Sequence, residues 1–393
     1  MTNYNINIFG STGEIGSKTL NILSKYYNSI KINLLVSNQN YKKLIKQTNY
    51  FTPKYICIIN HKHIPYIKKN INLKKTKVIH PNDLKNFLNN SYSDLTILSI
   101  SGYNALNYFL SIIKNTKLLG LVNKECIVSA GHLFNKLTKK YKTIIFPIDS
   151  EHNSLFQYFD KSNIKNYKDI KKIFLTASGG PFYGKKNNNN SFTLSKALNH
   201  PKWKMGYKNS IDSATLANKC LEIIEANYLF NIPFEKLDII IHPQALAHSI
   251  IEYKNFTSII NYFYHDMAIP INNFFIYATK NNNLIKNNNL FDFKPSINLS
   301  FDNPLIKEFP IIKTFNELDK TKPLNVIKFN CANEVAVELF TKKSIKFKDI
   351  NKFINKSLSI NLNYSVNSLS SIIKFQKEYV QMLYNKFLIN NKF

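Results

Sequence analysis

The feature that most restricts the fold is a regular alternation of short apolar runs and longer amphipathic segments over the first third of the chain. The runs cover residues 6–9, 32–36, 55–59, 95–100 and 117–122. Runs of this length, separated by segments with helical spacing, are typical of βαβ units. We therefore expect an α/β fold that begins with a parallel, doubly wound sheet.

A glycine-rich segment, Gly10-Ser-Thr-Gly13-Glu-Ile-Gly16, lies between the first run and a helix expected to begin near Ile15. Glycines let the backbone turn sharply and approach a pyrophosphate, which then faces the positive end of the helix. Such turns also occur for packing reasons alone. The place of this glycine-rich segment at the first βα turn nevertheless favours dinucleotide binding in a Rossmann-like domain.

The segment after the second run reads Ser37-Asn-Gln-Asn-Tyr-Lys-Lys43 and contains no carboxylate. Sites that prefer NAD place an acidic residue here to hold the ribose hydroxyls. The segment therefore favours NADP. Glu14 in the glycine-rich segment argues against dinucleotide binding there, because a carboxylate beside a pyrophosphate is repulsive unless it points outward.

The remainder of the chain changes character twice. A strand is expected at 172–176, followed by a Gly-, Pro- and Asn-rich loop at 178–206, a helix at 212–230 and a strand at 237–241. The Asn-rich stretch at 281–289 is typical of a linker, and the last part has apolar residues at helical spacing. We expect a first boundary near 147–151, an α/β middle domain and a C-terminal helical domain.

The net charge of +29 would suit a nucleic-acid-binding protein, but all the basic residues are lysines and they are spread along the chain. Direct readout of bases relies on arginine, so we expect no nucleic acid partner. The four cysteines form no CxxC pair and are expected to be reduced thiols. The chain has no apolar stretch of the roughly 20 residues that span a bilayer. The first expected strand begins too early to leave room for a leader peptide, so we expect a cytoplasmic protein without a membrane partner.

Two groups of carboxylates suggest a metal site. Asp149-Ser150-Glu151 follows the apolar run 143–148, at the end of a strand, where open sheets bind ligands. Asp149 and Glu151 offer hard oxygens suited to Mg²⁺ or Mn²⁺, although an exposed acidic turn is the commoner explanation of such a pair. A third carboxylate would come from the helix expected at 212–230.

Glu222 is expected on the helix at 212–230, with Asp212 as its N-cap. This helix would place four side chains on one face, namely Asn218, Lys219, Glu222 and Glu225. A solvated salt bridge between Lys219 and Glu222 accounts for this pattern equally well.

Two further segments suit a phosphate. Thr176-Ala-Ser178-Gly-Gly-Pro-Phe182 is a small-residue turn that can surround an anion, and His200-Pro-Lys-Trp203 suits a lid. The plainer alternatives are that Trp203 packs and His200 caps a turn. His242 and His248 lack a zinc spacing, so we assign them structural or supporting roles.

Taken in order, these motifs resemble the 1-deoxy-D-xylulose 5-phosphate reductoisomerase family. The resemblance also rests on Asn123-Lys-Glu125, Pro147-Ile-Asp-Ser-Glu-His-Asn153, Asp212-Ser-Ala-Thr-Leu-Ala-Asn-Lys219, Leu221-Glu-Ile-Ile-Glu-Ala226, His242-Pro-Gln244, Asp266-Met267 with Pro270, and Asn330-Cys-Ala-Asn-Glu-Val335. It implies a homodimer that uses NADPH and Mn²⁺ or Mg²⁺ to rearrange and reduce a small phosphorylated sugar to 2-C-methyl-D-erythritol 4-phosphate. It further implies an NADPH-binding domain at 1–149, a catalytic and dimerisation domain at 150–279 with a mobile lid at about 178–206, a linker at 280–307 and a helical domain at 308–393.

The resemblance also implies roles for individual residues. The metal ligands would be Asp149, Glu151 and Glu222, which with Lys124 form the catalytic set. The sugar phosphate would contact Lys124, Ser150, Glu151, Ser178, His200, Ser213, Asn218, Lys219 and Glu222. NADPH would contact Thr12, Gly13, Glu14, Ile15, Asn38, Gln39, Asn40, Asn123, Glu125 and Gly206.

Three departures from the family pattern make this chain distinctive. Glu14 stands where the family has a small serine, Asn38-Gln39-Asn40 where it commonly has Gly-Lys-Asn, and Cys220 where it has glycine. The second removes a basic partner for the 2′-phosphate of NADPH, which Lys42 or Lys43 could replace. The rival readings are a dehydrogenase without rearrangement, a basic nucleic-acid-binding protein and a decayed enzyme kept as a scaffold. The first two leave the three carboxylates unexplained, and the third conflicts with a complete set of metal and phosphate residues.

Overall fold

The computed structural model describes residues 4–162, 167–185, 192–203, 206–280 and 298–390. The chain forms two compact units, one comprising residues 1–123, 135–149 and 266–288, the other residues 124–134, 150–265 and 289–393. Because each unit combines separate stretches, the units differ from the four consecutive domains that we expected. The functions assigned to those domains remain predictions. Most of the expected linker, and parts of the expected lid, lie outside the described residues.

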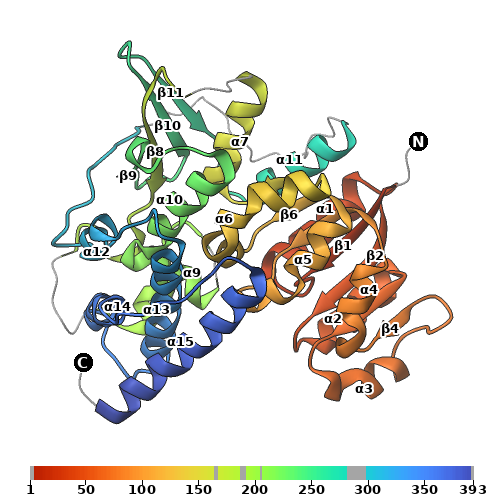
Figure 1. Cartoon of the computed structure of the whole chain (residues 1–393). Coiled ribbons are helices and arrows are strands. Elements are labelled where there is room, and N and C mark those ends of the chain that lie inside the picture. The colour runs from red at the N-terminus through yellow and green to blue at the C-terminus, as the bar shows by residue number, and fades with distance from the viewer. Residues whose placement is uncertain (1–3, 163–166, 186–191, 204–205, 281–297, 391–393) are drawn as a thin grey trace. The chain divides into compact units, whose positions relative to one another are not determined.

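The first unit contains a sheet of seven parallel strands in the order β4-β3-β2-β1-β5-β6-β7 (Figure 1). Their bounds are β1 Asn5–Phe9, β2 Lys31–Ser37, β3 Tyr55–Ile58, β4 Lys77–Ile79, β5 Ser93–Leu98, β6 Thr116–Leu121 and β7 Ile144–Pro147. The order reverses at β1, which is the doubly wound arrangement. The predicted α/β fold is confirmed. The sequence did not predict β4, because a strand of three residues is too short to show a pattern.

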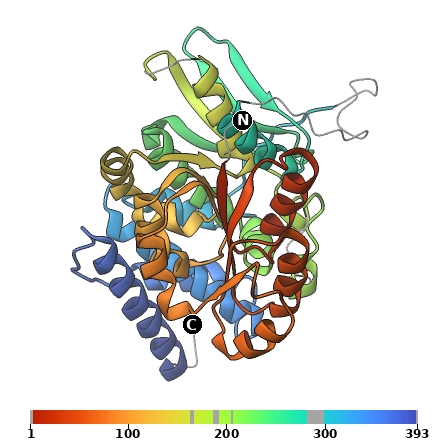
Figure 2. The ribbon, with the colours of Figure 1, turned by 90° about the vertical axis from the view of Figure 1, so that its right-hand side faces the viewer.

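Helices cover both faces of this sheet (Figure 2). They are α1 Glu14–Tyr26, α2 Tyr41–Phe51, α3 Ile64–Lys69, α4 Pro81–Asn89, α5 Leu106–Lys114 and α11 Ala268–Thr279. The helix α6 Lys124–Tyr141 belongs to the second unit up to Phe134 and to the first unit from Asn135. Local chemistry sets their starts: Asn40 accepts the Lys43 N–H as the cap of α2, and Pro81 occupies the first turn of α4. α11 packs on α1, where Tyr27 Oη donates to Asn272 at 2.9 Å.

The second unit contains a four-stranded sheet in the order β11-β10-β8-β9. The strands are β8 Ile170–Ala177, β9 Leu237–Ile241, β10 Ala247–Tyr253 and β11 Ser258–Tyr262, of which β8 and β9 are parallel and the other neighbours antiparallel. The expected strands at 172–176 and 237–241 are confirmed. β10 and β11 were not predicted, because polar residues such as His248 and Ser249 interrupt the apolar pattern of β10 and yet are buried.

The single helix expected at 212–230 is wrong: two helices, α9 Tyr207–Thr215 and α10 Ala217–Phe230, meet at Leu216. Leu216 has a left-handed backbone with φ of 65°, which ends one helix and starts the next. Asp212 therefore lies inside α9 and caps neither helix. The break turns α10 so that Asn218 and Lys219 fall in its first turn.

The remaining helices of this unit include α7 Ser150–Ser162 and α8 Leu194–Leu198. The C-terminal part is helical, as predicted: α12 Ile311–Glu317, α13 Pro323–Thr341, α14 Asp349–Leu358 and α15 Leu369–Asn390. α13 is the central helix, buried along most of its length against α14 and α15 (Figure 1). None of the helices in the described part of the chain combines the length and apolar character needed to cross a membrane.

Candidate active site

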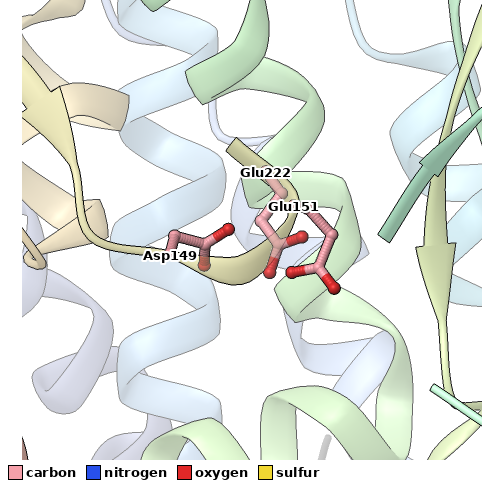
Figure 3. Close-up of side chains that lie close together, drawn as sticks. All are labelled: Asp149, Glu151 and Glu222. Atoms are coloured by element: carbon pink, nitrogen blue, oxygen red, sulfur yellow. The ribbon is translucent and has the colours of Figure 1, made fainter. Parts of the chain in front are cut away.

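Three carboxylates converge where β7 ends and α7 begins. Asp149 directly precedes α7, Glu151 lies in its first turn, and Glu222 comes from α10. One oxygen from each lies within 4.8 Å of the others (Figure 3). Glu151 and Glu222 are buried, so an exposed acidic turn does not explain the cluster. Three hard oxygen donors at this separation fit Mg²⁺ or Mn²⁺.

Two lysines contact this acidic cluster. Lys124 Nζ, at the start of α6, lies 2.8 Å from Glu222 Oε1 and 3.8 Å from Glu225 Oε2. Lys219 Nζ lies 2.6 Å from Glu222 Oε2 and 3.4 Å from Glu151 Oε2. The Lys219–Glu222 pair exists, but both side chains are buried, which is unlike the solvated pair considered above. Burying charges is costly unless they are paired, so these contacts favour a functional site over a surface salt bridge.

Hydrogen bonds to neighbouring groups fix the orientation of the acidic residues. His248 Nε2 donates to the Phe263 carbonyl at 3.0 Å, and its Nδ1 lies 3.3 Å from Glu151 Oε1. Ser150 Oγ donates to Glu151 Oε2 at 2.9 Å, and Asn218 Nδ2 donates to Glu222 Oε1. This contact of His248 with Glu151 agrees with the structural or supporting role that we assigned to His248 from the sequence.

Ser178, His200 and Ser213 gather around one ring nitrogen. His200 Nε2 lies 3.0 Å from Ser178 Oγ and 3.1 Å from Ser213 Oγ. His200 Nδ1 accepts from the backbone N–H groups of Lys202 and Trp203 at 3.1 and 2.9 Å, so the ring proton must sit on Nε2. Burial, then the charge of Lys219, lowers the pKa of His200 to about 4. His200 is thus a neutral donor aimed at the two serines.

A buried ionic network lies around Lys208 on α9. Lys208 Nζ is 2.7 Å from Asp212 Oδ2 and 3.2 Å from Glu125 Oε1, and Asn333 Nδ2 donates to Asp212 Oδ1 at 2.8 Å. Burial opposes the charge on Lys208, but Asp212, Glu125 and Glu334 outweigh it and hold the Lys208 pKa above its ordinary value. The network joins α6, α9 and α13 directly beside Lys124.

The glycine loop has the geometry that close approach to a dinucleotide requires. Gly10 has φ of +78°, and a Cβ on Gly16 would lie 2.3 Å from the Gly10 carbonyl oxygen. Only glycine fits these two positions. Thr12 Oγ1 lies 2.7 Å from Ser37 Oγ, which ties the loop to the end of β2. Glu14 is exposed in the first turn of α1, where its charge is favourable to the helix dipole.

The residues expected to contact NADPH divide between the two units. Asn38 and Gln39 are exposed after β2, Asn40 caps α2, and Asn123 Nδ2 donates to the carbonyls of Ile100 and Gly102. Thr12, Gly13, Glu14, Ile15, Asn38, Gln39, Asn40 and Asn123 belong to the first unit, and Glu125 and Gly206 to the second. Their contacts with a cofactor remain predictions.

Sequence reasoning missed Lys208 and the true environment of Asp212. The i,i+4 spacing of a lysine and an aspartate was a usable signal, but the expected helix began too late to include Lys208. Cys220 is fully buried on α10, and burial raises the pKa of its thiol. It therefore behaves as a small apolar side chain.

Comparison with known proteins gives a consistent result along the whole chain. Residues 6–131 match the family model of 1-deoxy-D-xylulose 5-phosphate reductoisomerase, residues 145–230 its C-terminal domain, and residues 264–382 the DXP reductoisomerase C-terminal domain. The enzyme of that name from Clostridium kluyveri is 37% identical over 388 residues, covering 97% of this chain and 99% of the relative. The one from Pelagibacter ubique is 39% identical over 356 residues, covering 89% and 90%.

Solved structures agree with this result. A DOX-P reductoisomerase in complex with NADPH, fosmidomycin and magnesium superposes with a TM-score of 0.90 at 28% identity, covering 99% of this chain and 100% of that chain. The Zymomonas mobilis enzyme in complex with NADPH gives a TM-score of 0.87 at 29% identity, covering 98% and 99%. The chain belongs to the 1-deoxy-D-xylulose 5-phosphate reductoisomerase family.

Proposed function

We propose that this protein converts 1-deoxy-D-xylulose 5-phosphate to 2-C-methyl-D-erythritol 4-phosphate, with NADPH as hydride donor and Mg²⁺ or Mn²⁺ held by Asp149, Glu151 and Glu222. The observation that carries the proposal is the convergence of these carboxylates beside Lys124 and Lys219 in a chain of this family. When bound, the metal would act as a Lewis acid toward the carbonyl and hydroxyl oxygens of the sugar, and NADPH would supply the hydride.

Lys124 is placed to assist the carbon–carbon rearrangement. Its ammonium group contacts Glu222 at 2.8 Å, so it would lie beside the substrate oxygens that the proposed metal holds and on which negative charge develops. A cation held there stabilises that charge at little reorganisation cost. Lys219, 3.4 Å from Glu151, partly neutralises the acidic cluster and keeps the carboxylates compatible with an anionic substrate.

Ser178, His200 and Ser213 are placed to bind the phosphate of the sugar. Each can donate a hydrogen bond, and the pKa of His200, lowered by burial to about 4, keeps its ring neutral at physiological pH. Positive charge would come from Lys219, whose field already lowers the His200 pKa. Binding energy from this remote group can serve to close the expected lid over the reacting carbons.

We further propose a homodimer. β11 lies at one edge of its sheet and exposes Ile259 and Ile260 to 41% and 43%. Phe256, between β10 and β11, is 89% exposed. Such an edge invites pairing with a second copy. A cytoplasmic location and the absence of a nucleic acid partner remain predictions from the sequence.

The decisive experiment follows NADPH absorbance with purified protein and 1-deoxy-D-xylulose 5-phosphate, with and without Mn²⁺, and identifies the product. We expect metal-dependent oxidation that Glu222→Gln reduces by at least about a hundredfold. Glu225→Gln is the comparison, because Glu225 is a buried carboxylate on the same helix that contacts Lys124 at 3.8 Å but is not one of the three proposed ligands, so we expect a smaller loss of activity and little loss of metal affinity.

Direct titration with Mn²⁺ should show the same contrast in metal affinity between the two variants. No oxidation by folded wild-type protein would refute the proposal. Oxidation that yields an unrearranged alcohol would instead identify a simple dehydrogenase.

A further inference from the structure

Acidic residues are absent from one long part of the first unit. Between Ile15 and Asn82 the chain has thirteen lysines and no Asp or Glu, although it has 24 acidic residues in total. This stretch forms most of α1 and all of β2, α2, β3, α3 and β4. The local field over this half of the sheet is therefore strongly positive and suits an anionic ligand.

The ends of β1, β2 and β3 form one continuous edge beside the glycine loop. The Gly10 and Ser11 N–H groups donate to the Val36 carbonyl at 2.9 and 3.0 Å. Beyond the strands, Ile59 N–H donates to Ser37 O and Asn60 N–H to Asn38 O, both at 2.9 Å. Asn60 is thus fixed next to Asn38, where an NADP site meets the adenosine ribose.

A basic turn follows immediately. The 3₁₀ turn η1, His61–His63, starts after Asn60, and His63 stacks on Tyr41 with ring centroids 4.2 Å apart. Tyr41 N–H in turn donates to Gln39 O at 2.8 Å, and Asn60 Nδ2 lies 3.4 Å from His63 Nε2. These contacts hold η1 against residues 38–41. His61 and Lys62 remain exposed.

We infer that Lys62, held in place by the stacking of His63 on Tyr41, binds the 2′-phosphate of NADPH and so selects NADPH over NADH. The inference rests on the proposed use of NADPH. Residues 38–40 offer only amide side chains, which cannot neutralise a phosphate monoester. An ammonium group can do so, and the uncharged 2′-hydroxyl of NADH gains little from it.

Binding to the full-length protein, measured without sugar or metal, tests this. Dissociation constants for NADPH and NADH come from fluorescence titration, and those for adenosine 2′,5′-bisphosphate and adenosine 5′-monophosphate from calorimetry. Lys62→Ala should weaken NADPH and the bisphosphate about tenfold and leave NADH and the monophosphate within about twofold. His63→Ala should show a smaller loss of the same selectivity.

Lys31→Ala and Lys77→Ala are matched controls. Both lysines are exposed and belong to the same acid-free stretch, but they begin β2 and β4, at the opposite edge of a parallel sheet. We expect them to leave all four constants unchanged. Lys42→Ala and Lys43→Ala test the rival lysines on α2.

The outcomes separate this inference from the proposed function. If Lys62→Ala leaves selectivity intact while Lys42→Ala or Lys43→Ala removes it, the inference is wrong and the proposed function stands. The inference is also wrong if Lys62→Ala weakens NADPH and NADH equally, or if Lys31→Ala weakens NADPH as much as Lys62→Ala does. Either result would mean that Lys62 contributes only to the general positive field. Wild-type protein that binds neither dinucleotide would refute the proposed function itself.

Discussion

Lys208 and Asp212 lie one turn apart on α9, with Lys208 Nζ 2.7 Å from a carboxylate that is only 1% exposed. Lys208 also faces Glu125 and Glu334, so a single cation compensates several buried carboxylates. Lys208→Met should therefore lower the free energy of unfolding by about 3 kcal/mol, because it leaves buried charge without a partner. Lys208→Arg should recover most of this loss. Urea unfolding measures both.

A pair with the same spacing but no burial serves as the control. Lys313 and Glu317 are 3.9 Å apart on α12, and their side chains are 66% and 67% exposed. Lys313→Met should change stability by less than about 0.5 kcal/mol. Similar small effects at both sites would contradict the view that the Lys208 network stabilises the junction of α6, α9 and α13.

Glu334, on α13, should make stability depend on pH. Burial raises the pKa of Glu334 from 4.5 to about 7. The charge of Lys208 opposes this shift, and the charges of Glu125, Asp212 and Glu338 add to it. Between these values the folded state keeps a proton that the unfolded state releases, so stability contributed here falls as pH rises from about 4.5 to about 7. Glu334→Gln removes this loss. Between pH 4.5 and pH 8 the free energy of unfolding of the variant should therefore increase, relative to that of the wild type, by on the order of 3 kcal/mol. Urea unfolding at both pH values, with exposed Glu317→Gln for comparison, checks it, and a pH-independent difference would contradict it.

The sequence predicted the architecture well where local pattern and burial agree. The runs that became β1, β2, β5, β6 and β7 are mostly apolar, with few polar residues such as Asn7, Asn33 and Thr96, because both faces of a parallel sheet are covered. It failed at Leu216, where a leucine adopts a left-handed backbone that no propensity indicates. It also failed at β10, whose polar residues are buried by tertiary contacts: His248 contacts Glu151 of the acidic cluster, and Ser249 accepts a hydrogen bond from Ser154 on α7.

The site was predictable in part for a related reason. The family resemblance, which rests on the order of the motifs, implied that Asp149, Glu151 and Glu222 share one metal site. The structure places one oxygen of each within 4.8 Å of the others. The Lys208 network could not be assembled in this way, because it joins residues 125, 208, 212 and 333 from three helices. Spacing along the chain does not report such tertiary contacts.

His200 should stay neutral across the pH range in which the enzyme works. Its Nδ1 accepts two backbone N–H bonds, and burial and Lys219 lower its pKa to about 4. Nitrogen NMR of labelled histidine should show Nε2 protonated and Nδ1 unprotonated from pH 8 down to pH 5, with His200→Gln to assign the signal. Because the folded pKa is depressed, stability contributed by neutral His200 is present above about 6.5 and is lost as pH falls toward 4. Titration near 6.5, or a protonated Nδ1, would contradict the assigned tautomer.

The exposed strand β11 leads to a prediction about assembly. Ile260 pairs across the sheet with Ile250 and is 43% exposed at an edge that has no further strand among the described residues. Ile260→Lys places a charge on this edge, and charged residues at sheet edges block pairing with another chain. Light scattering should show a dimer for the wild type and, at micromolar concentrations, mainly monomer for the variant. Ile306→Lys is the control, because Ile306 is 51% exposed in the same unit but lies outside the sheet. If Ile306→Lys dissociates the dimer and Ile260→Lys does not, the subunits associate through another surface; if the wild type is itself monomeric, the proposed homodimer is wrong.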